Sequence, residues 1–477
     1  MELYLDNIGI IKNSKILLDG LTVITGKNSS GKTTVGKVMY SLLSAGSDLE
    51  EAFEFSKKRY IVSKLADIER ILKLRRYRRM HRDEKNDIFR LLDIISMHTF
   101  ARFSLDDLIL FLSDTKEVII RLEIEDYLTY IGSNQSYNNL TEAINQDFPQ
   151  WKQKCVDICE TALLVINDEN AFYNFVKART DAFINHEFSK QIKPIRCDNC
   201  ESKIELYEKD KCIVKAAVKD KNKLEFSSES TFLYSSDNCI FIDNPYVIDR
   251  LDKNNFLSHS MYKPYEENEV DAIITSDDIK DHDEILSSLI IDNPKNSYFD
   301  DLEIQNKFKN VFSKINEIVP GEFLSTEDGY FYVKDGKELS VKNLATGSKM
   351  FFIIKKLLFG GLIDSNTMLI LDEPESHLHP EWINKFAEIL VYLTKDVKVK
   401  ILITTHSPNL MLALSVYAKK MEMNTSAHFY IAENIDDEYF SQIRCIDDSI
   451  EEGYAHLSIP FVKMNLEMKG IQNGVSE

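Results

Sequence analysis

Two adjacent carboxylates in the middle of an otherwise ordinary sequence have the types and the spacing to do chemistry. Asp372 and Glu373 directly follow the apolar run Met368–Leu371. Such a run is typical of a buried parallel strand, and open α/β sheets bind ligands at the carboxyl ends of their strands. Desolvated carboxylates are costly without a cation. We therefore expect Asp372 to hold a metal ion, directly or through water, and Glu373 to polarise a water molecule.

A glycine-rich loop near the N-terminus matches the pattern G-x-x-x-x-G-K-[ST]. In such loops, consecutive backbone N–H groups surround phosphate oxygens at a helix N-terminus, whose dipole favours an anion. The Lys32 ammonium then reaches the β- and γ-phosphates, and the Thr33 hydroxyl binds Mg²⁺. The predicted phosphate-binding residues are Gly26, Lys27, Asn28, Ser29, Ser30, Gly31, Lys32, Thr33 and Thr34.

A histidine completes the constellation. His406 follows a second buried run, Lys400–Thr405. By itself it would more often be a histidine that starts a helix. Because the phosphate loop, Asp372 and His406 all follow predicted strands, one parallel sheet can bring them to one edge. This conjunction predicts nucleotide-triphosphate hydrolysis, in which Glu373 orients or activates water and His406 senses the γ-phosphate.

The elements that position these residues follow from hydrophobic patterning. Strands are predicted at 2–10, 16–25, 203–207, 212–218, 239–242 and 330–333, and helices at 33–43, 349–358 and 381–393. We predict an α/β fold with a mixed or parallel sheet core, a large all-α insertion and a small antiparallel β subdomain. The expected parts are residues 1–47 (core with phosphate loop), 48–187 (helical insertion), 188–250 (β subdomain), 251–319 (second helical region) and 320–477 (remainder of the core).

Composition narrows the class of protein. The net charge of −19 argues against nucleic-acid binding by the whole surface. The basic run Lys73–Arg82 is better interpreted as a solvated helix or a protein contact, with phosphate contact as the alternative. No apolar run reaches 18 residues and no secretory signal begins the chain, so we expect no membrane span. Seven scattered cysteines favour a reducing cytoplasm.

The cysteine spacings also have structural interpretations. Cys155 and Cys159 are one helical turn apart without a companion histidine pair, which favours core thiols. The C-x-x-C at Cys197–Cys200 lacks suitably spaced further ligands for zinc, so metal binding there is the weaker interpretation.

The motifs together resemble a known family. The loop 26–34, the segment 344–348, the strand ending in Asp372-Glu373-Pro374 and the segment 405–407 are similar to the ABC-type ATPase head of SMC, RecF-like and overcoming-lysogenisation-defect-like ATPases. The run from Asp372 to Trp382 is most similar to the PtuA-like ATPases of the Septu anti-phage system. The resemblance covers residues 1–45 and about 340–410.

The resemblance carries further expectations. It implies ATP and Mg²⁺ as ligands, head-to-head assembly of two or more copies, and a separate HNH-type nuclease as partner. In that assembly the segment 344–348 of one copy caps ATP bound to another, through Ala345, Thr346, Gly347 and Ser348. It also implies that Gln191 contributes to the Mg²⁺ site. Only about seventy residues follow His406, fewer than a nuclease domain needs, so a partner is expected to cut any DNA.

Two departures from the family pattern matter. Ala345 and Thr346 replace the usual serine and first glycine of the capping motif, which predicts slow or partner-controlled hydrolysis. No adenine-stacking aromatic can be placed, Tyr4 being the only weak candidate, so the preference for ATP rests on the resemblance. The alternatives are a RecF-like ATPase that clamps DNA directly and a nucleotide-gated scaffold with negligible turnover.

Overall fold

The computed structural model describes residues 1–74, 87–97, 103–130, 138–196, 200–219, 222–232, 238–251, 279, 281–291, 304, 308–326, 329–435 and 439–474. The described residues up to 47 and from 179 onward form a first compact unit, and residues 48–178 form a second. All residues that were predicted to do chemistry belong to the first unit.

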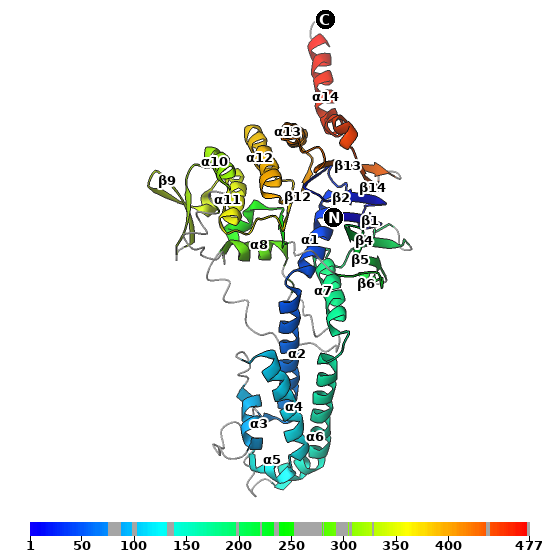
Figure 1. Cartoon of the computed structure of the whole chain (residues 1–477), viewed down its shortest axis with the longest axis vertical. Coiled ribbons are helices and arrows are strands. Elements are labelled where there is room, and N and C mark those ends of the chain that lie inside the picture. The colour runs from blue at the N-terminus through cyan, green and yellow to red at the C-terminus, as the bar shows by residue number, and fades with distance from the viewer. Residues whose placement is uncertain are drawn as a thin grey trace. The chain divides into compact units, whose positions relative to one another are not determined.

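A six-stranded sheet forms the centre of the first unit (Figure 1). Its order is β14-β13-β3-β12-β11-β7, and all neighbouring pairs are parallel except β13 with β14. Strands β3, β11 and β12 are buried on both faces. For β11 and β12 their continuous apolar runs predicted this burial. The strands are β3 (Leu21–Gly26), β7 (Asn238–Ile242), β11 (Thr367–Asp372), β12 (Lys400–Thr405), β13 (Ala427–Ile435) and β14 (Phe440–Cys445).

Helices cover both faces of this sheet. On one face α1 (Lys32–Gly46) approaches so closely that a side chain at Gly36 would contact Ile370 and Phe241. On the other face, Leu369 and Ile403 join a core with residues of the surrounding helices. Those helices are α10 (Lys309–Ile318), α11 (Thr346–Phe359), α12 (Pro380–Tyr392) and α13 (Pro408–Lys420). The sheet is therefore the rigid base for every loop at its carboxyl edge.

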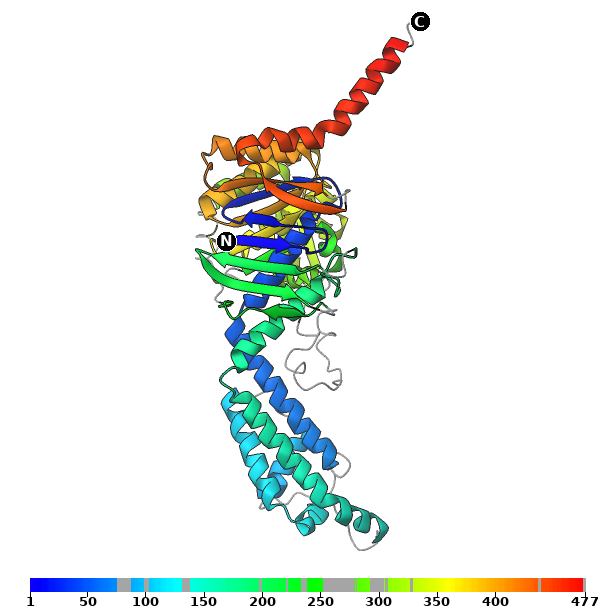
Figure 2. The same cartoon turned by 90° about the vertical axis from the view of Figure 1, so that its right-hand side faces the viewer.

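A second, antiparallel sheet has the order β2-β1-β4-β5-β6, with the N-terminal strands beside strands from after residue 200 (Figure 2). Its strands are β1 (Glu2–Asp6), β2 (Ser14–Leu17), β4 (Ser202–Glu208), β5 (Lys211–Val218) and β6 (Leu224–Phe226). A third sheet contains β8 (Glu322–Thr326), β9 (Gly329–Lys334) and β10 (Lys337–Ser340). The predicted α/β fold with an antiparallel β subdomain and a helical insertion is confirmed.

Two predicted strands are shorter in the structure. The strand expected over 2–10 ends at Asp6, because Asn7 and Gly9 have positive φ angles that turn the chain. The strand expected over 16–25 is divided into β2 and β3 by the turn at Gly20. A side chain there would lie 2.3 Å from the Ser426 carbonyl oxygen, so only glycine fits this turn.

The second unit is helical and has its own apolar core. It contains α2 (Leu49–Ile71), α3 (Asp87–Met97), α4 (Leu105–Arg121), α5 (Ile124–Tyr130), α6 (Asn138–Ile166) and the first part of α7 (Ala171–Glu187). Cys155 and Cys159 are fully buried in this core, and burial raises the pKa of each thiol to about 12. They are the core thiols that the sequence predicted.

The first unit contains further helices after β7. Among them are a 3-10 helix (Pro245–Arg250), α8 (His282–Ile291) and the C-terminal α14 (Ile450–Gly474). Within the predicted second helical region, 251–319, the structure thus describes α8 and α10. Among the described residues, no helix is both long enough and apolar enough to cross a membrane.

Candidate active site

The loop between β3 and α1 has the conformation of a phosphate cradle. Gly31 has a φ of +84° and precedes the first helical residue, where a side chain would come within 2.7 Å of Ile11. A side chain at Gly26 would lie 2.7 Å from the Ala432 carbonyl oxygen. Both positions therefore require glycine, and the loop brings its backbone N–H groups to the N-terminus of α1, where an anion is favoured.

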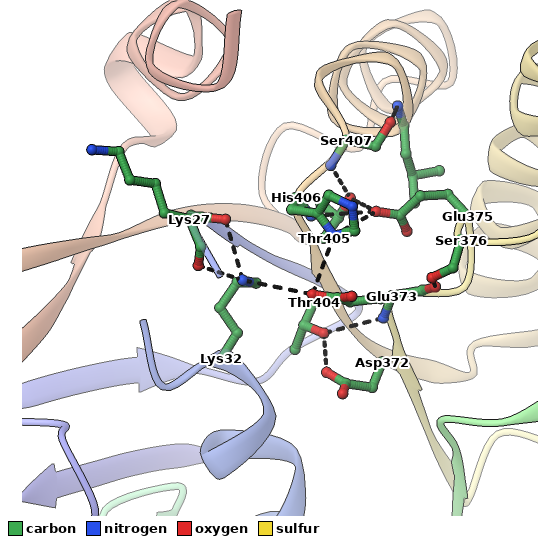
Figure 3. Close-up of polar contacts among 12 residues, drawn as sticks. Lys27, Lys32, Asp372, Glu373, Glu375, Ser376, Thr404, Thr405, His406 and Ser407 are labelled. Carbon is green, nitrogen blue, oxygen red and sulfur yellow. Dashed lines mark hydrogen bonds and ion pairs between the residues drawn. The ribbon is translucent and has the colours of Figure 1, made fainter. Parts of the chain in front are cut away.

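Lys32 is held inside this loop. Its side chain is only 4% exposed, and its Nζ donates hydrogen bonds to the carbonyl oxygens of Gly26 (3.2 Å) and Lys27 (2.8 Å) (Figure 3). Burial lowers the pKa of Lys32, although the nearby carboxylates oppose the shift. The hydroxyl of Ser30 is buried, and within the described part of the chain it has no hydrogen-bond partner. A buried cation beside an unpaired hydroxyl fits the phosphate groups of ATP, because the anion would satisfy both.

The predicted metal ligands lie together. Thr33 Oγ1 donates a hydrogen bond of 2.8 Å to Asp372 Oδ2, and the Thr404 hydroxyl donates to Asp372 Oδ1. Burial raises the pKa of Asp372, although both hydrogen bonds oppose the shift. Oxygen ligands at the end of a strand, with a costly desolvated carboxylate among them, fit Mg²⁺. The structure thus brings together two of the three predicted ligands.

Glu373 and His406 meet beside Lys32. Glu373 Oε1 lies 3.2 Å from His406 Nδ1 and 3.8 Å from Lys32 Nζ. The backbone of Glu373 has a φ of +48°, which costs energy for a residue other than glycine. Its N–H donates to the Thr404 carbonyl oxygen at 3.0 Å. The turn directs the Glu373 carboxylate away from Asp372 and toward the histidine, which separates the two predicted roles.

A third carboxylate was not predicted. Glu375 is 6% exposed, and its Oε1 accepts hydrogen bonds from Thr405 Oγ1 (2.5 Å) and from the His406 backbone N–H (3.3 Å). Burial raises the pKa of Glu375. Its carboxylate therefore fastens the segment that carries His406 to the turn after β11 (Figure 3). In the sequence it stands two residues after Glu373, but nothing in the sequence indicated burial.

A fourth carboxylate, Asp243, also reaches this edge unpredicted. It follows β7, whose Ile242 pairs with Leu371 of β11, so Asp243 and Asp372 leave neighbouring strands at the same level. Asp243 contributes to the raised pKa of Asp372. An apolar run that ends in a carboxylate, the pattern that singled out Asp372, recurs at 239–243 and could have indicated this position.

The predicted capping segment forms the start of α11. Ala345 precedes the first helical residue, Thr346. The Thr346 hydroxyl lies 3.0 Å from the hydroxyl of Tyr246, which is 41% exposed. A side chain at Gly347 would lie 2.9 Å from the His377 carbonyl oxygen. The glycine that the motif retains is thus required by packing against the turn after β11.

Other predicted residues lie further from these contacts. Gln191 is exposed in the turn after α7, where the neighbouring Ile192 carbonyl accepts a hydrogen bond from the Gly9 N–H. Tyr4 donates a hydrogen bond to Asn13 on the second sheet. Residues 197–199 of the C-x-x-C and residues 75–82 of the basic run lie outside the described residues. The predicted roles of all of them remain predictions.

Comparisons with known proteins place this geometry in context. A family model described as AAA ATPase domain matches residues 1–411. No curated protein matches the chain. Among solved structures, the SMC head domain from Thermotoga maritima is 12% identical with a TM-score of 0.35. The match covers 93% of this chain and 97% of the Thermotoga maritima chain. The Smc head domain with an extended coiled coil from Pyrococcus furiosus, bound to the C-terminal domain of ScpA, is 10% identical with a TM-score of 0.31, and covers 98% of each chain. These scores are low, so the fold assignment rests on the strand order given above.

Proposed function

Because the chain belongs to the AAA ATPase domain family, we propose that it binds and hydrolyses ATP at the carboxyl edge of its central sheet. The observation that carries this proposal is the meeting of the buried Lys32, the Thr33–Asp372 pair and the Glu373–His406 pair at one edge. These groups leave three adjacent strands in the sheet, β3, β12 and β11.

We assign each residue a role in the reaction. Lys32 would contact the β- and γ-phosphates, while Thr33 and Asp372 would hold Mg²⁺. By the family resemblance, Gln191 in the turn after α7 would be a further ligand. Bound Mg²⁺ would neutralise charge that develops on the transferred phosphoryl group. Glu373 accepts a hydrogen bond from the attacking water and orients it. His406, 3.2 Å from Glu373, senses the γ-phosphate.

We further propose that the ATPase assembles head to head. The start of α11, from Ala345 to Ser348, caps ATP bound to a second copy. Because the Thr346 hydroxyl already faces Tyr246 at 3.0 Å, it is less available to a phosphate than the family's serine. Slow or partner-controlled hydrolysis follows from this arrangement.

The partner that we propose is a separate HNH-type nuclease, and the biological role is bacterial anti-phage defence. The support is the sequence resemblance over the segment from Asp372 to Trp382. The test is to mix this protein with the HNH nuclease encoded beside its gene and to measure plasmid cleavage with ATP present. Cleavage that does not depend on this protein, or the absence of such a nuclease gene, would contradict the partner assignment.

ATP-dependent assembly is tested by measuring the mass of the protein in solution. Light scattering is recorded for wild type and Glu373→Gln with and without ATP–Mg²⁺, together with phosphate release. We expect ATP to change the mass, and the variant to retain the ATP-bound assembly while its turnover falls by about 10²-fold or more. The conservative variant Glu467→Gln, on the exposed part of α14, should behave as wild type.

Two results would redirect the interpretation. An unchanged mass with undetectable phosphate release would favour the nucleotide-gated scaffold, because ATP would then be structural. If ATP changes the mass but the Glu373→Gln variant does not retain the ATP-bound assembly longer than wild type, assembly is independent of hydrolysis.

A further inference from the structure

A partly buried ionic cluster lies beside the proposed Mg²⁺ site and has no role in the reaction described above. His282, the first residue of α8, lies between two carboxylates. Its Nδ1 is 3.1 Å from Glu187 Oε1, and its Nε2 is 3.1 Å from Asp243 Oδ2. The side chains of His282, Glu187 and Asp243 are 12%, 3% and 31% exposed. A buried carboxylate such as Glu187 is costly without a cation, and a protonated His282 would supply one, while Asp243 keeps some contact with water.

The cluster connects three elements with the site. Asp243 follows β7 at the level where Asp372 ends β11. Glu187 is the last residue of α7, and its backbone carbonyl accepts a hydrogen bond from Lys37 of α1 at 3.2 Å. The cluster therefore joins three elements. They are β7, which pairs with the strand of Asp372, α7, which is hydrogen-bonded to α1, and α8.

Aromatic packing fixes the plane of the imidazole. The His282 ring is stacked on Phe241 of β7 with centroids 4.6 Å apart, and Tyr40 of α1 meets its edge at 5.8 Å. The ring therefore has little freedom to rotate away from either carboxylate. A side chain with both ring nitrogens directed at acceptors donates to both only as the imidazolium.

The charges around His282 also favour its imidazolium form. Burial alone would lower the pKa of His282, but hydrogen bonds and charges from Asp243 and Glu187 outweigh it and raise the pKa to about 10. Ligand-type atoms of Asp243, His282 and Asp283 lie within 4.8 Å of one another, a spacing that would also suit a metal ion. Both ring nitrogens already face carboxylate oxygens, which favours a proton over a metal.

We propose that His282 is a positioning residue for ATP hydrolysis, one that holds Asp243 in place with its charge compensated and so keeps it from competing with Asp372 for Mg²⁺. The proposal rests on the ATPase function argued above. Without the imidazolium, Asp243 becomes an unbalanced carboxylate at the level of Asp372. The metal would then be attracted toward Asp243 and away from the geometry that Thr33 and Asp372 provide.

The test compares wild type, His282→Gln and Asp243→Asn/His282→Gln. Mg²⁺ is titrated against binding of a fluorescent ATP analogue, and phosphate release gives kcat and KM. We expect His282→Gln to lower the half-saturating Mg²⁺ concentration by roughly tenfold, the scale of one uncompensated charge near the site. We also expect the fold-decrease in kcat to be larger than the fold-change in KM. Adding Asp243→Asn should return the Mg²⁺ dependence to that of wild type, a reversal that a merely structural role would not produce.

The matched control is His186→Gln, an exposed histidine beside Glu187, which should leave both readouts unchanged. An unaltered Mg²⁺ dependence in folded His282→Gln, or no reversal by Asp243→Asn, would overturn the proposal. If His282→Gln does not fold, the variant Glu187→Gln/His282→Gln is used, which removes the imidazolium and its other carboxylate partner but keeps Asp243. A lowered half-saturating Mg²⁺ concentration supports the proposal there, and an unaltered one contradicts it. If wild type releases no phosphate, the hydrolysis assignment fails, while the Mg²⁺ dependence of analogue binding still tests the role of His282.

Discussion

Three carboxylates at the end of β11 and in the turn after it have different surroundings, and the differences separate their proposed roles. Asp372 accepts hydrogen bonds from two hydroxyl groups, and burial raises its pKa. Glu373 is partly exposed and faces Lys32 and His406. Glu375 is buried, and its Oε1 accepts hydrogen bonds from the segment after β12. In the proposed reaction these similar groups therefore have three roles: Asp372 as a metal ligand, Glu373 as the group that orients water, and Glu375 as the group that fastens the segment after β12.

The fastening role of Glu375 gives one prediction. Glu375→Ala should lower kcat by about tenfold to a hundredfold and destabilise the fold by about 1–3 kcal/mol, because the buried Thr405 hydroxyl loses its acceptor and His406 loses its position. Glu375→Gln, which keeps an acceptor oxygen, should be milder in both respects. Phosphate release and urea unfolding measure the two effects, with the exposed Glu381→Ala as the control. Wild-type turnover in Glu375→Ala would refute the assignment.

A second residue-scale prediction concerns pH. The pKa of His282 is raised to about 10 from about 6.5 in an unfolded chain. Its contribution to the free energy of unfolding is therefore complete below about pH 6.5 and is lost as the pH rises through about 10. We expect the stability difference between wild type and His282→Gln to be constant in acid and to shrink above pH 6.5, by up to about 1.4 kcal/mol per pH unit.

Urea unfolding at several pH values between 6 and 9.5 measures this difference. The groups that face the ring are Glu187, Asp243, Asp283 and Tyr40. A difference that grows toward alkaline pH would mean that His282 is neutral in the folded protein.

At the scale of elements, each functional group leaves the end of a strand or the start of a helix that packs on the central sheet. The phosphate loop follows β3, the Asp372 turn follows β11, and His406 follows β12. The start of α11 is positioned differently, by contact with the turn after β11 at Gly347 and His377. That contact joins the capping segment to the loop that carries Glu373.

This contact predicts the effect of Gly347→Ala. The added methyl group would overlap the His377 carbonyl oxygen at 2.9 Å, so α11 or the turn has to move, at a cost of about 1–3 kcal/mol. We expect ATP-dependent assembly, measured by light scattering, to be lost while binding of ATP to Lys32 is kept. Lys342→Ala, exposed before the helix, should assemble normally. Normal assembly of Gly347→Ala would instead argue against α11 as the capping element.

At the scale of the whole molecule, charge is the feature that bears on partners. The net charge of −19 opposes DNA binding by the surface as a whole. The basic run Lys73–Arg82 is the exception, although residues 75–82 lie outside the described residues. The proposed control of a separate nuclease does not require this chain to bind DNA, whereas a DNA clamp does.

Charge reversal at the basic run distinguishes these two functions. If the chain controls a nuclease without binding DNA itself, the variant with Arg75, Arg76, Arg78 and Arg79 changed to glutamate should bind duplex DNA as weakly as wild type. Fluorescence anisotropy at several salt concentrations measures the affinity. A strong, salt-dependent affinity that the variant loses would favour the RecF-like clamp, because phosphate contacts are screened by salt.

The sequence by itself determined the parts of this protein that depend on local pattern. The loop 26–34 and the apolar runs before Asp372 and His406 have signatures that lie within a few residues, so they predicted the phosphate cradle, the buried strands and the sheet edge. Only the tertiary structure decided which distant groups meet there. Asp243 reaches Asp372 through the pairing of β7 with β11, and Glu375 becomes a buried partner of Thr405 through the pairing of β11 with β12. Burial and pairing depend on strand order, and strand order is a property of the folded chain.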